Sequence, residues 1–271
     1  MVFDYEFAAI FSLIVGLIFF FQRIPHITGP FIVLRLTKLK LHPKIETFDP
    51  ESAKYPLVAR DHFEESQSQL EELGFHPIAW MLLPNMMPNT STIAIMFHKP
   101  SHSEYAMANI IFTENSTVGV QTMSYVEFQT EFTSGVEVAV LNPKTIGTFK
   151  TPEHIEKYQF PGNRDLKFLY SVFEKIADKT GNFRHRVDAL TSQYQGDPVE
   201  MLRHGMQKEL NREVERGWMY VNQSAGQYRL NIFGAFRGAW LELFPFKQIR
   251  LAANRRRNRQ LLDELGISEV G

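Results

Sequence analysis

The run from Phe7 to Phe21, FAAIFSLIVGLIFFF, constrains this chain more than any other stretch, because it holds fifteen residues without a charge. A helix of that length reaches roughly 22 Å at about 1.5 Å per residue, which is short of a hydrocarbon core near 30 Å. The helix can extend to Pro25, with Tyr5 and Arg23 suited to the two membrane interfaces. The sequence therefore predicts an N-terminal transmembrane anchor over residues 1–25.

Two alternatives to an anchor fit the run less well. A secretory signal peptide carries cations before its apolar run, whereas residues 1–6 contain Asp4 and Glu6 and no Lys or Arg. No small-residue cleavage pattern follows Phe21 either. A buried helix of a globular protein would keep a polar stripe, but the run is apolar on every side.

The charges after the run predict its orientation. No cation precedes the run, and five follow it closely: Arg23, Arg35, Lys38, Lys40 and Lys44. Because cytoplasmic flanks carry the excess of Lys and Arg, we expect a single-pass protein with its N-terminus outside and its C-terminal domain in the cytoplasm.

The remainder of the 271 residues suits one folded domain. A net charge of −1 and a hydrophobic fraction of 44% argue against intrinsic disorder and against a globally basic protein that binds nucleic acid. The absence of cysteine excludes disulfides, thiolate metal sites and cysteine nucleophiles. We expect no nucleic-acid partner.

Residues 26–48 read as a basic juxtamembrane segment in which leucines alternate with Arg35, Lys38 and Lys40. One interpretation is an interfacial segment whose cations gain about 1 kcal/mol each beside anionic lipid. The other is a strand or short helix that packs on the domain and leaves its cations in water. The pattern favours neither.

Residues 49–230 predict an α+β domain. A helix between Asp49 and Gly74, with an acidic outer face and a start that Pro56 can delay, precedes a β meander over residues 78–141. The meander ends in a hairpin of residues 126–132 and 136–140, in which apolar and polar side chains alternate.

Capping signals then predict two further helices and a second hairpin. Asn163 or Asp165 starts one helix, and Asp197 with Pro198 starts another whose methionines read as core filler. Residues 218–230 form this second hairpin or, alternatively, two strands added to the sheet. We expect an antiparallel sheet of roughly five to seven strands, covered by about three or four helices.

Residues 231–271 predict a C-terminal amphipathic basic helix. Aromatic residues at helical spacing include Trp240, Pro245 kinks or restarts the helix, and a basic block follows. The block holds six cations: Lys247, Arg250, Arg255, Arg256, Arg257 and Arg259. With Arg35, Lys38, Lys40 and Trp240, these form the predicted membrane-surface contact. The alternatives are a helix that covers the sheet with solvated arginines, a pairing with the acidic helix, and a nucleic-acid or protein partner.

Motifs for chemistry are weak. No phosphate loop, dinucleotide fingerprint, nucleophile elbow or zinc-protease motif occurs. His98, His102 and Glu104 form the best metal-like cluster, but we expect polar loop residues there and no metal. His185 and Arg186 are interpreted as a solvated helix edge and not as an anion site. Glu127 and Glu131, about 13 Å apart on one strand, are too distant for a glycosidase pair.

The sequence therefore predicts no catalytic residues and no cofactor. It favours a membrane-tethered interaction or scaffolding module whose partners are the lipid bilayer and another membrane or cytosolic protein. Two alternatives stay open. One is a domain that binds a small apolar ligand in a pocket lined by Phe128, Phe132 and Trp80, and the other is a hydrolase with dispersed catalytic residues.

Overall fold

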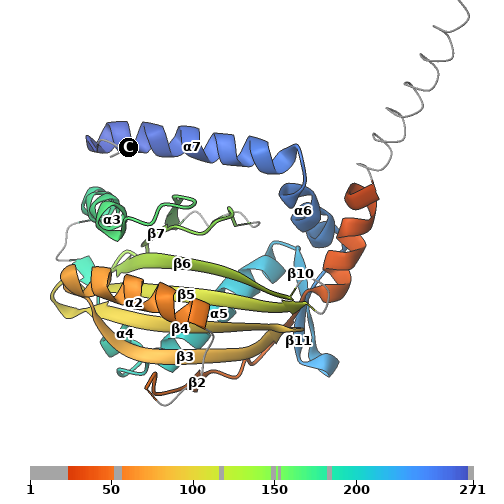
Figure 1. Ribbon diagram of the computed structural model, residues 1–271, viewed down its shortest axis with the longest axis horizontal. Helices are drawn as coiled ribbons and strands as arrows, with labels where there is room; N and C mark the ends of the chain where they lie inside the picture. The colour runs from red at the N-terminus through yellow and green to blue at the C-terminus, as the bar shows by residue number, and fades with distance from the viewer. Residues whose placement is uncertain are drawn as a thin grey trace, which may run out of the picture.

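The computed structural model describes residues 24–51, 57–115, 119–147, 151, 154–181 and 185–267. The apolar run Phe7–Phe21 lies outside the described residues. Across the described ranges, none of the helices combines the length and the apolar character that a membrane span needs. These ranges form an α+β fold, as predicted, with two sheets and flanking helices (Figure 1).

An eight-stranded sheet forms the centre of the molecule, in the order β2-β3-β4-β5-β6-β7-β8, with β9 paired to β6. Its strands are β2 (Glu46–Thr47), β3 (His76–Met87), β4 (Thr90–Lys99), β5 (Glu104–Asn115), β6 (Gly119–Phe132), β7 (Glu137–Leu141), β8 (Ile155–Gln159) and β9 (Arg186–Val187). The predicted meander is confirmed, because β3 to β7 are neighbours in chain order. The β6–β7 hairpin is confirmed too, and its turn places Gly135 at φ +77°, a region open to glycine. A short 3-10 helix, η1 (Pro100–His102), joins β4 to β5.

The sheet differs from the predicted antiparallel one at β8, which runs parallel to β7. A tight turn joins only antiparallel strands, so a parallel neighbour needs a longer crossing segment. Here the crossing begins at Asn142, whose side chain accepts from the Val126 N–H at 2.6 Å and donates to the Asn163 carbonyl at 2.6 Å. These bonds hold the start of the crossing against β6.

The main core lies on one face of this sheet. Along β6 the buried side chains are the predicted alternate set, Val126, Phe128, Thr130 and Phe132. Helices α2 (Leu57–Glu72) and α3 (Leu166–Thr180) pack on this face, and α7 (Phe246–Leu265) adds Leu261 and Leu262. Each such apolar side chain contributes about 1.5–3 kcal/mol by leaving water. The C-terminal half of α7 is therefore part of the core.

Helices also cover the opposite face. The short α4 (Ala189–Ser192) precedes α5 (Pro198–Glu215), whose predicted N-cap Asp197 accepts from the backbone N–H groups of Val199 and Glu200. Met201 and Met206 of α5 pack against a small group of buried residues on β3 and β4: Met81, Leu83 and Met96. The methionines serve as core filler, as predicted.

A second sheet of three strands lies at one end of the molecule, in the order β1-β11-β10 (Figure 1). Its strands are β1 (Lys38–Lys40), β10 (Met219–Asn222) and β11 (Gln227–Leu230), and a 3-10 helix, η3 (Gln223–Ala225), closes the β10–β11 hairpin. The N-terminal helix, residues 24–36, and α6 (Ile232–Glu242) pack beside it around a small second core. Residues 26–48, which were predicted to be a juxtamembrane segment, thus pack on the domain and include a helix and a strand, while Arg35 and Lys40 stay exposed.

Candidate functional site

The residues predicted to contact a membrane surface fall on four elements. Arg35 lies on the N-terminal helix, Lys38 and Lys40 on β1, and Trp240 on α6. The remaining six lie on α7: Lys247, Arg250, Arg255, Arg256, Arg257 and Arg259. The fold brings the first three elements together, because β1 pairs with β11 and β11 leads into α6.

The basic block of α7 divides into cations that hold the helix and cations that face solvent. Lys247 and Arg250 reach Glu242 at 3.4 and 3.5 Å, and Arg250 also donates to backbone carbonyls that include Leu241. Arg257 is exposed, but its guanidinium lies over the Tyr158 ring at 4.8 Å. The other exposed members are Arg255, Arg256 and Arg259.

The N-terminal helix is fastened to α6 and to the α6–α7 corner. The Trp240 indole N–H donates to the His26 carbonyl at 2.7 Å, and His26 Nε2 lies 2.8 Å from the Phe244 carbonyl oxygen. The helices pack closely at Gly29, where an added Cβ would lie in ordinary van der Waals contact, 3.7 Å from the Ala239 Cβ. These bonds join the N-terminal helix, α6 and the α6–α7 corner into one packed unit.

Exposed apolar side chains gather on this unit, and we call them the apolar surface. Its members are Ile24, Ile27, Phe31, Ile32 and Leu36 of the N-terminal helix, Ile232, Phe233 and Trp240 of α6, and Phe244, Phe246 and Ile249 at the α6–α7 corner. Ile78 and Tyr220 are the other large hydrophobic side chains exposed in the described ranges. The Phe236 ring joins the two helices, 6.0 Å from Phe31 and 5.4 Å from Trp240.

A buried polar cluster on the main-core face escaped the sequence reasoning. Glu104 is fully buried, its Oε1 contacts the Arg186 guanidinium, and its Oε2 accepts from the Tyr170 hydroxyl at 2.9 Å. Lys99 donates to the same hydroxyl at 2.6 Å. The prediction of a solvated Arg186 is wrong, because Arg186 lies on β9 with 1% of its side chain exposed.

Two further carboxylates surround the Arg186 guanidinium. Asp178 lies 3.0 Å from it and Glu174 lies 3.4 Å from it. Burial, followed by the hydrogen bond and charge of Glu174, raises the pKa of Glu104 to about 8. Burial by itself would raise the pKa of Glu174. The hydrogen bonds of Glu174 and the Arg186 charge outweigh burial, so the pKa of Glu174 is lowered. Glu104 thus holds a proton near neutral pH while Glu174 stays ionised.

A smaller polar cluster lies on the opposite face of the β4–β5 pair, which carries Lys99 and Glu104 on its main-core face. The rings of His98 and Tyr105 stack at 4.8 Å, the Tyr105 hydroxyl donates to Asp188, and it accepts from the Leu190 N–H at 2.9 Å. Burial lowers the pKa of His98 from its ordinary value of 6.5. These bonds fix the start of α4 against β5.

The metal-like residues do not converge. His98 pairs with Tyr105 and Lys99 with Glu104 across the β4–β5 register, so His98 and Glu104 point to opposite faces of the sheet. His102 instead bonds the Ser101 hydroxyl at 2.7 Å. Among the described residues, no group of three His, Asp or Glu side chains is placed to hold a metal ion.

The paired carboxylates of β6 have separate partners. Glu127 lies 3.2 Å from the Lys157 ammonium of β8, and the Glu127 charge raises the pKa of Lys157. Glu131 lies opposite Glu137 of β7 and Val187 of β9. The two carboxylates do not share one site.

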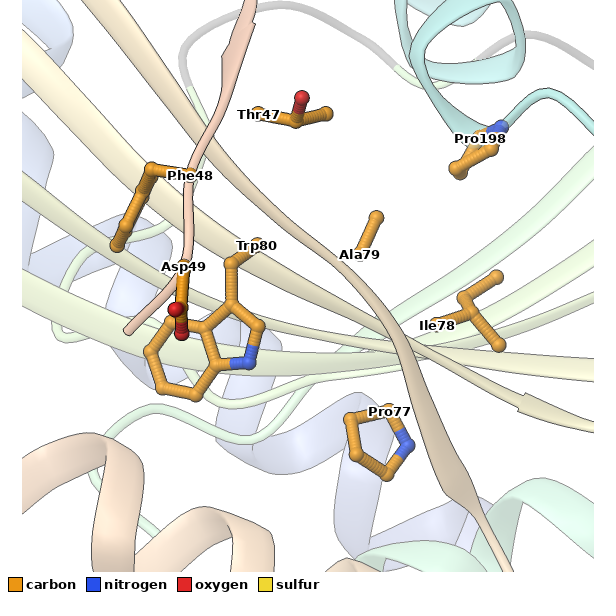
Figure 2. A pocket seen from close by; sticks show the side chains of 8 residues that line it. All are labelled: Thr47, Phe48, Asp49, Pro77, Ile78, Ala79, Trp80 and Pro198. Carbon is orange, nitrogen blue, oxygen red and sulfur yellow. The ribbon is translucent and has the colours of Figure 1, made fainter. Parts of the chain in front are cut away.

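The pocket in Figure 2 lies at the β2–β3 edge and has a volume of about 510 Å³. Its lining residues are Thr47, Phe48, Asp49, Pro77, Ile78, Ala79, Trp80 and Pro198. The Trp80 ring meets the Phe48 ring edge-on at 6.0 Å. Phe128 and Phe132 were expected beside Trp80 in a ligand pocket, but both are buried in the main core.

Comparison with known protein families, with curated proteins and with solved structures finds no match to this chain. The function must therefore be argued from the chain's own residues.

Proposed function

We propose that this chain is a single-pass membrane protein that holds an α+β domain at the cytosolic side of a membrane, where the domain acts as an interaction or scaffolding module. Its partners are the lipid bilayer and another membrane or cytosolic protein. The observation that carries the proposal is the uncharged run Phe7–Phe21, which leads within three residues into the exposed apolar N-terminal helix.

The chemistry of the buried clusters supports a binding role over a catalytic one. Glu104 has the raised pKa that often marks a catalytic acid. However, it is fully buried and bonded to Arg186 and Tyr170, so it offers no surface to a substrate. A structural ion-pair network accounts for the same shift.

Alkaline carbonate extraction of membranes tests the anchor. The full chain is expected to stay in the pellet, whereas Leu13→Arg with Leu17→Arg is expected to leave it, since each Arg at a helix centre costs about 2.5–3.5 kcal/mol of insertion free energy. The matched control places the same two cations at the exposed positions Ser68 and Gln260 and should stay in the pellet. Release of the unaltered chain would refute the anchor.

Reporter fusions test the orientation. Alkaline phosphatase fused to the C-terminus is expected to be inactive, and a fluorescent protein fused at the same point is expected to fluoresce, because that end is proposed to be cytosolic. The reverse pair of results would overturn the proposed sidedness.

A further inference from the structure

We propose that the apolar surface sits in the interfacial layer of the same bilayer that the Phe7–Phe21 run is proposed to span. The domain is then held in one orientation, with the N-terminal helix, α6 and the α6–α7 corner against lipid. This inference rests on the proposed function and adds to it the surface of contact.

Several side chains of the apolar surface are highly exposed. Phe233 is 70% exposed, Phe244 is 69% exposed and Ile249 is 60% exposed. Soluble monomers rarely leave a contiguous apolar patch of many such side chains in water. These residues come from segments that lie together at one end of the molecule, where the N-terminal helix runs beside α6 (Figure 1). A partner of low polarity is therefore needed at this end.

The apolar surface begins close to the Phe7–Phe21 run along the chain. Ile24, the first described residue of the apolar surface, comes three residues after Phe21. Three residues span at most roughly 11 Å when fully extended. The interfacial layer on each side of the hydrocarbon core is itself roughly 5–8 Å thick. If the Phe7–Phe21 run ends at the edge of the hydrocarbon core, the N-terminal helix must therefore begin within or next to the interfacial layer.

The fastening of the two helices extends this constraint to α6. Trp240 and Phe244 bond to His26 through the contacts described above, at 2.7 and 2.8 Å. The α6 surface cannot swing away from the N-terminal helix without breaking both bonds. Phe233 and Phe244 must therefore approach the membrane together with the N-terminal helix.

Charged residues are distributed unevenly along the chain. Residues 22–45 and 231–260 hold twelve of the 29 Lys and Arg residues, five in the first range and seven in the second, but a single one of the 30 Asp and Glu. The rest of the chain thus carries 17 cations and 29 acids. An anionic cytosolic leaflet attracts the first set and repels the second. This asymmetry selects lipid over a second copy of the chain, whose identical basic surface would repel.

The single acid in those ranges is already neutralised. Glu242 is paired with Lys247 and Arg250 at 3.4 and 3.5 Å. No unpaired carboxylate of these ranges would have to leave water on contact. Trp240 carries an apolar ring and a polar N–H, the combination that favours membrane interfaces.

Single-cysteine labelling of the full chain tests the inference, and the absence of native cysteine makes each label unique. Phe233→Cys and Phe244→Cys would carry a polarity-sensitive fluorophore in vesicles of phosphatidylcholine and phosphatidylserine. Ile78→Cys is the matched control, an exposed apolar position on β3. Nitroxide groups near the headgroup end of the acyl chains serve as the lipid-borne quencher, and iodide serves as the aqueous one.

The expected result is a blue-shifted emission at both α6–α7 positions, with quenching by the lipid nitroxide and protection from iodide. Ile78→Cys is expected to show the opposite pattern. Equal iodide quenching at all three positions would overturn the inference. Protection from iodide without nitroxide quenching would overturn it too, because a protein partner or second copy would then cover the surface.

Carbonate extraction of the same labelled vesicles separates the two levels of the argument. If the chains stay with the vesicles but their labels remain in water, contact between the apolar surface and lipid is refuted, while the proposed anchor is not. Chains released by carbonate refute the anchor itself. A thermal unfolding curve for each cysteine variant, matched to the unaltered chain, establishes that the labels report on a folded domain.

Discussion

Removing Arg186 should destabilise the domain in a way that depends on pH. The Arg186 side chain is 1% exposed and contacts the fully buried Glu104 carboxylate. Arg186→Met keeps much of the side chain's length and removes the charge. Breaking one half of a buried ion pair costs about 3–5 kcal/mol, because the remaining charge is left uncompensated.

The raised pKa of Glu104 sets the pH window. A pKa of about 8 in the folded chain, against an ordinary value of 4.5, means that folding favours the protonated form. The stability from this group is fully present below about pH 4.5 and is lost as the pH rises through about 8.

The two effects combine in the variant. At about pH 6 Glu104 is protonated and carries no charge that Arg186 must compensate. We therefore expect Arg186→Met to lose little stability at this pH. Near pH 9 the unaltered chain keeps Glu104 ionised beside Arg186, and the variant cannot. Its Glu104 stays protonated instead, so the two chains diverge only above the pKa of about 8, and we expect the loss to be larger at pH 9 by at most about 1.4 kcal/mol.

Thermal unfolding of the full chain in detergent, followed by tryptophan fluorescence at both pH values, measures this loss. Each kcal/mol lowers the melting temperature by roughly 2–4 °C for a domain of this size. Adding Glu104→Gln to Arg186→Met should abolish the pH dependence, since Gln keeps the Tyr170 bond without a charge. The control Arg203→Met breaks a partly exposed pair with Glu200 and should change stability by at most about 1 kcal/mol. Equal losses for Arg186→Met at pH 6 and pH 9 would refute the reasoning.

Three further variants, the first with a matched glycine control, test other parts of the fold. Gly234→Ala should leave little folded protein, because its Cβ would meet the Trp218 carbonyl oxygen at 2.2 Å, while Gly205→Ala has open space and should stabilise α5 by about 0.5–1 kcal/mol in the same melting assay. Asp197→Ala removes the N-cap of α5 and should cost about 1 kcal/mol by denaturant unfolding. Arg250→Glu should lower the melting temperature, because it breaks the bonds that hold the start of α7.

Each variant has a contradicting outcome. A normal melting temperature for Gly234→Ala would mean that α6 does not approach Trp218 as closely as described. An unchanged midpoint for Asp197→Ala would place the start of α5 elsewhere. For Arg250→Glu the comparison is Arg255→Glu, an exposed position on the same helix, and equal melting of the two would contradict the division of the basic block.

Local signals predicted the elements that depend on local physics. The alternation of Val126 and Phe128 with polar neighbours predicted β6, because successive strand residues face opposite sides. Capping residues predicted two helix starts, at Asn163 or Asp165 and at Asp197, because a side-chain acceptor satisfies the free N–H groups of the first turn; the structure selects Asp165 for the first. Such signals act over a few residues, so the sequence alone can reveal them.

The candidate surface was predicted in part. Trp240 and the basic residues of α7 were singled out, but Phe233 and Phe244 read equally well as the buried stripe of a helix. The 70% exposure of Phe233 follows from which face of α6 the N-terminal helix covers, and the 69% exposure of Phe244 follows from its place at the α6–α7 corner. That choice is made between segments that are far apart in the sequence.

The sequence by itself determined the uncharged run Phe7–Phe21, the meander and the helix caps, because each depends on neighbours along the chain. Only the tertiary structure decided that Glu104 meets Arg186, 82 residues further on, and that His98 and Glu104 face apart. The tertiary structure also decided that β8 runs parallel to β7 and that β1 pairs with β11. Partners so distant are selected by the packing of whole elements, which leaves no local pattern to read.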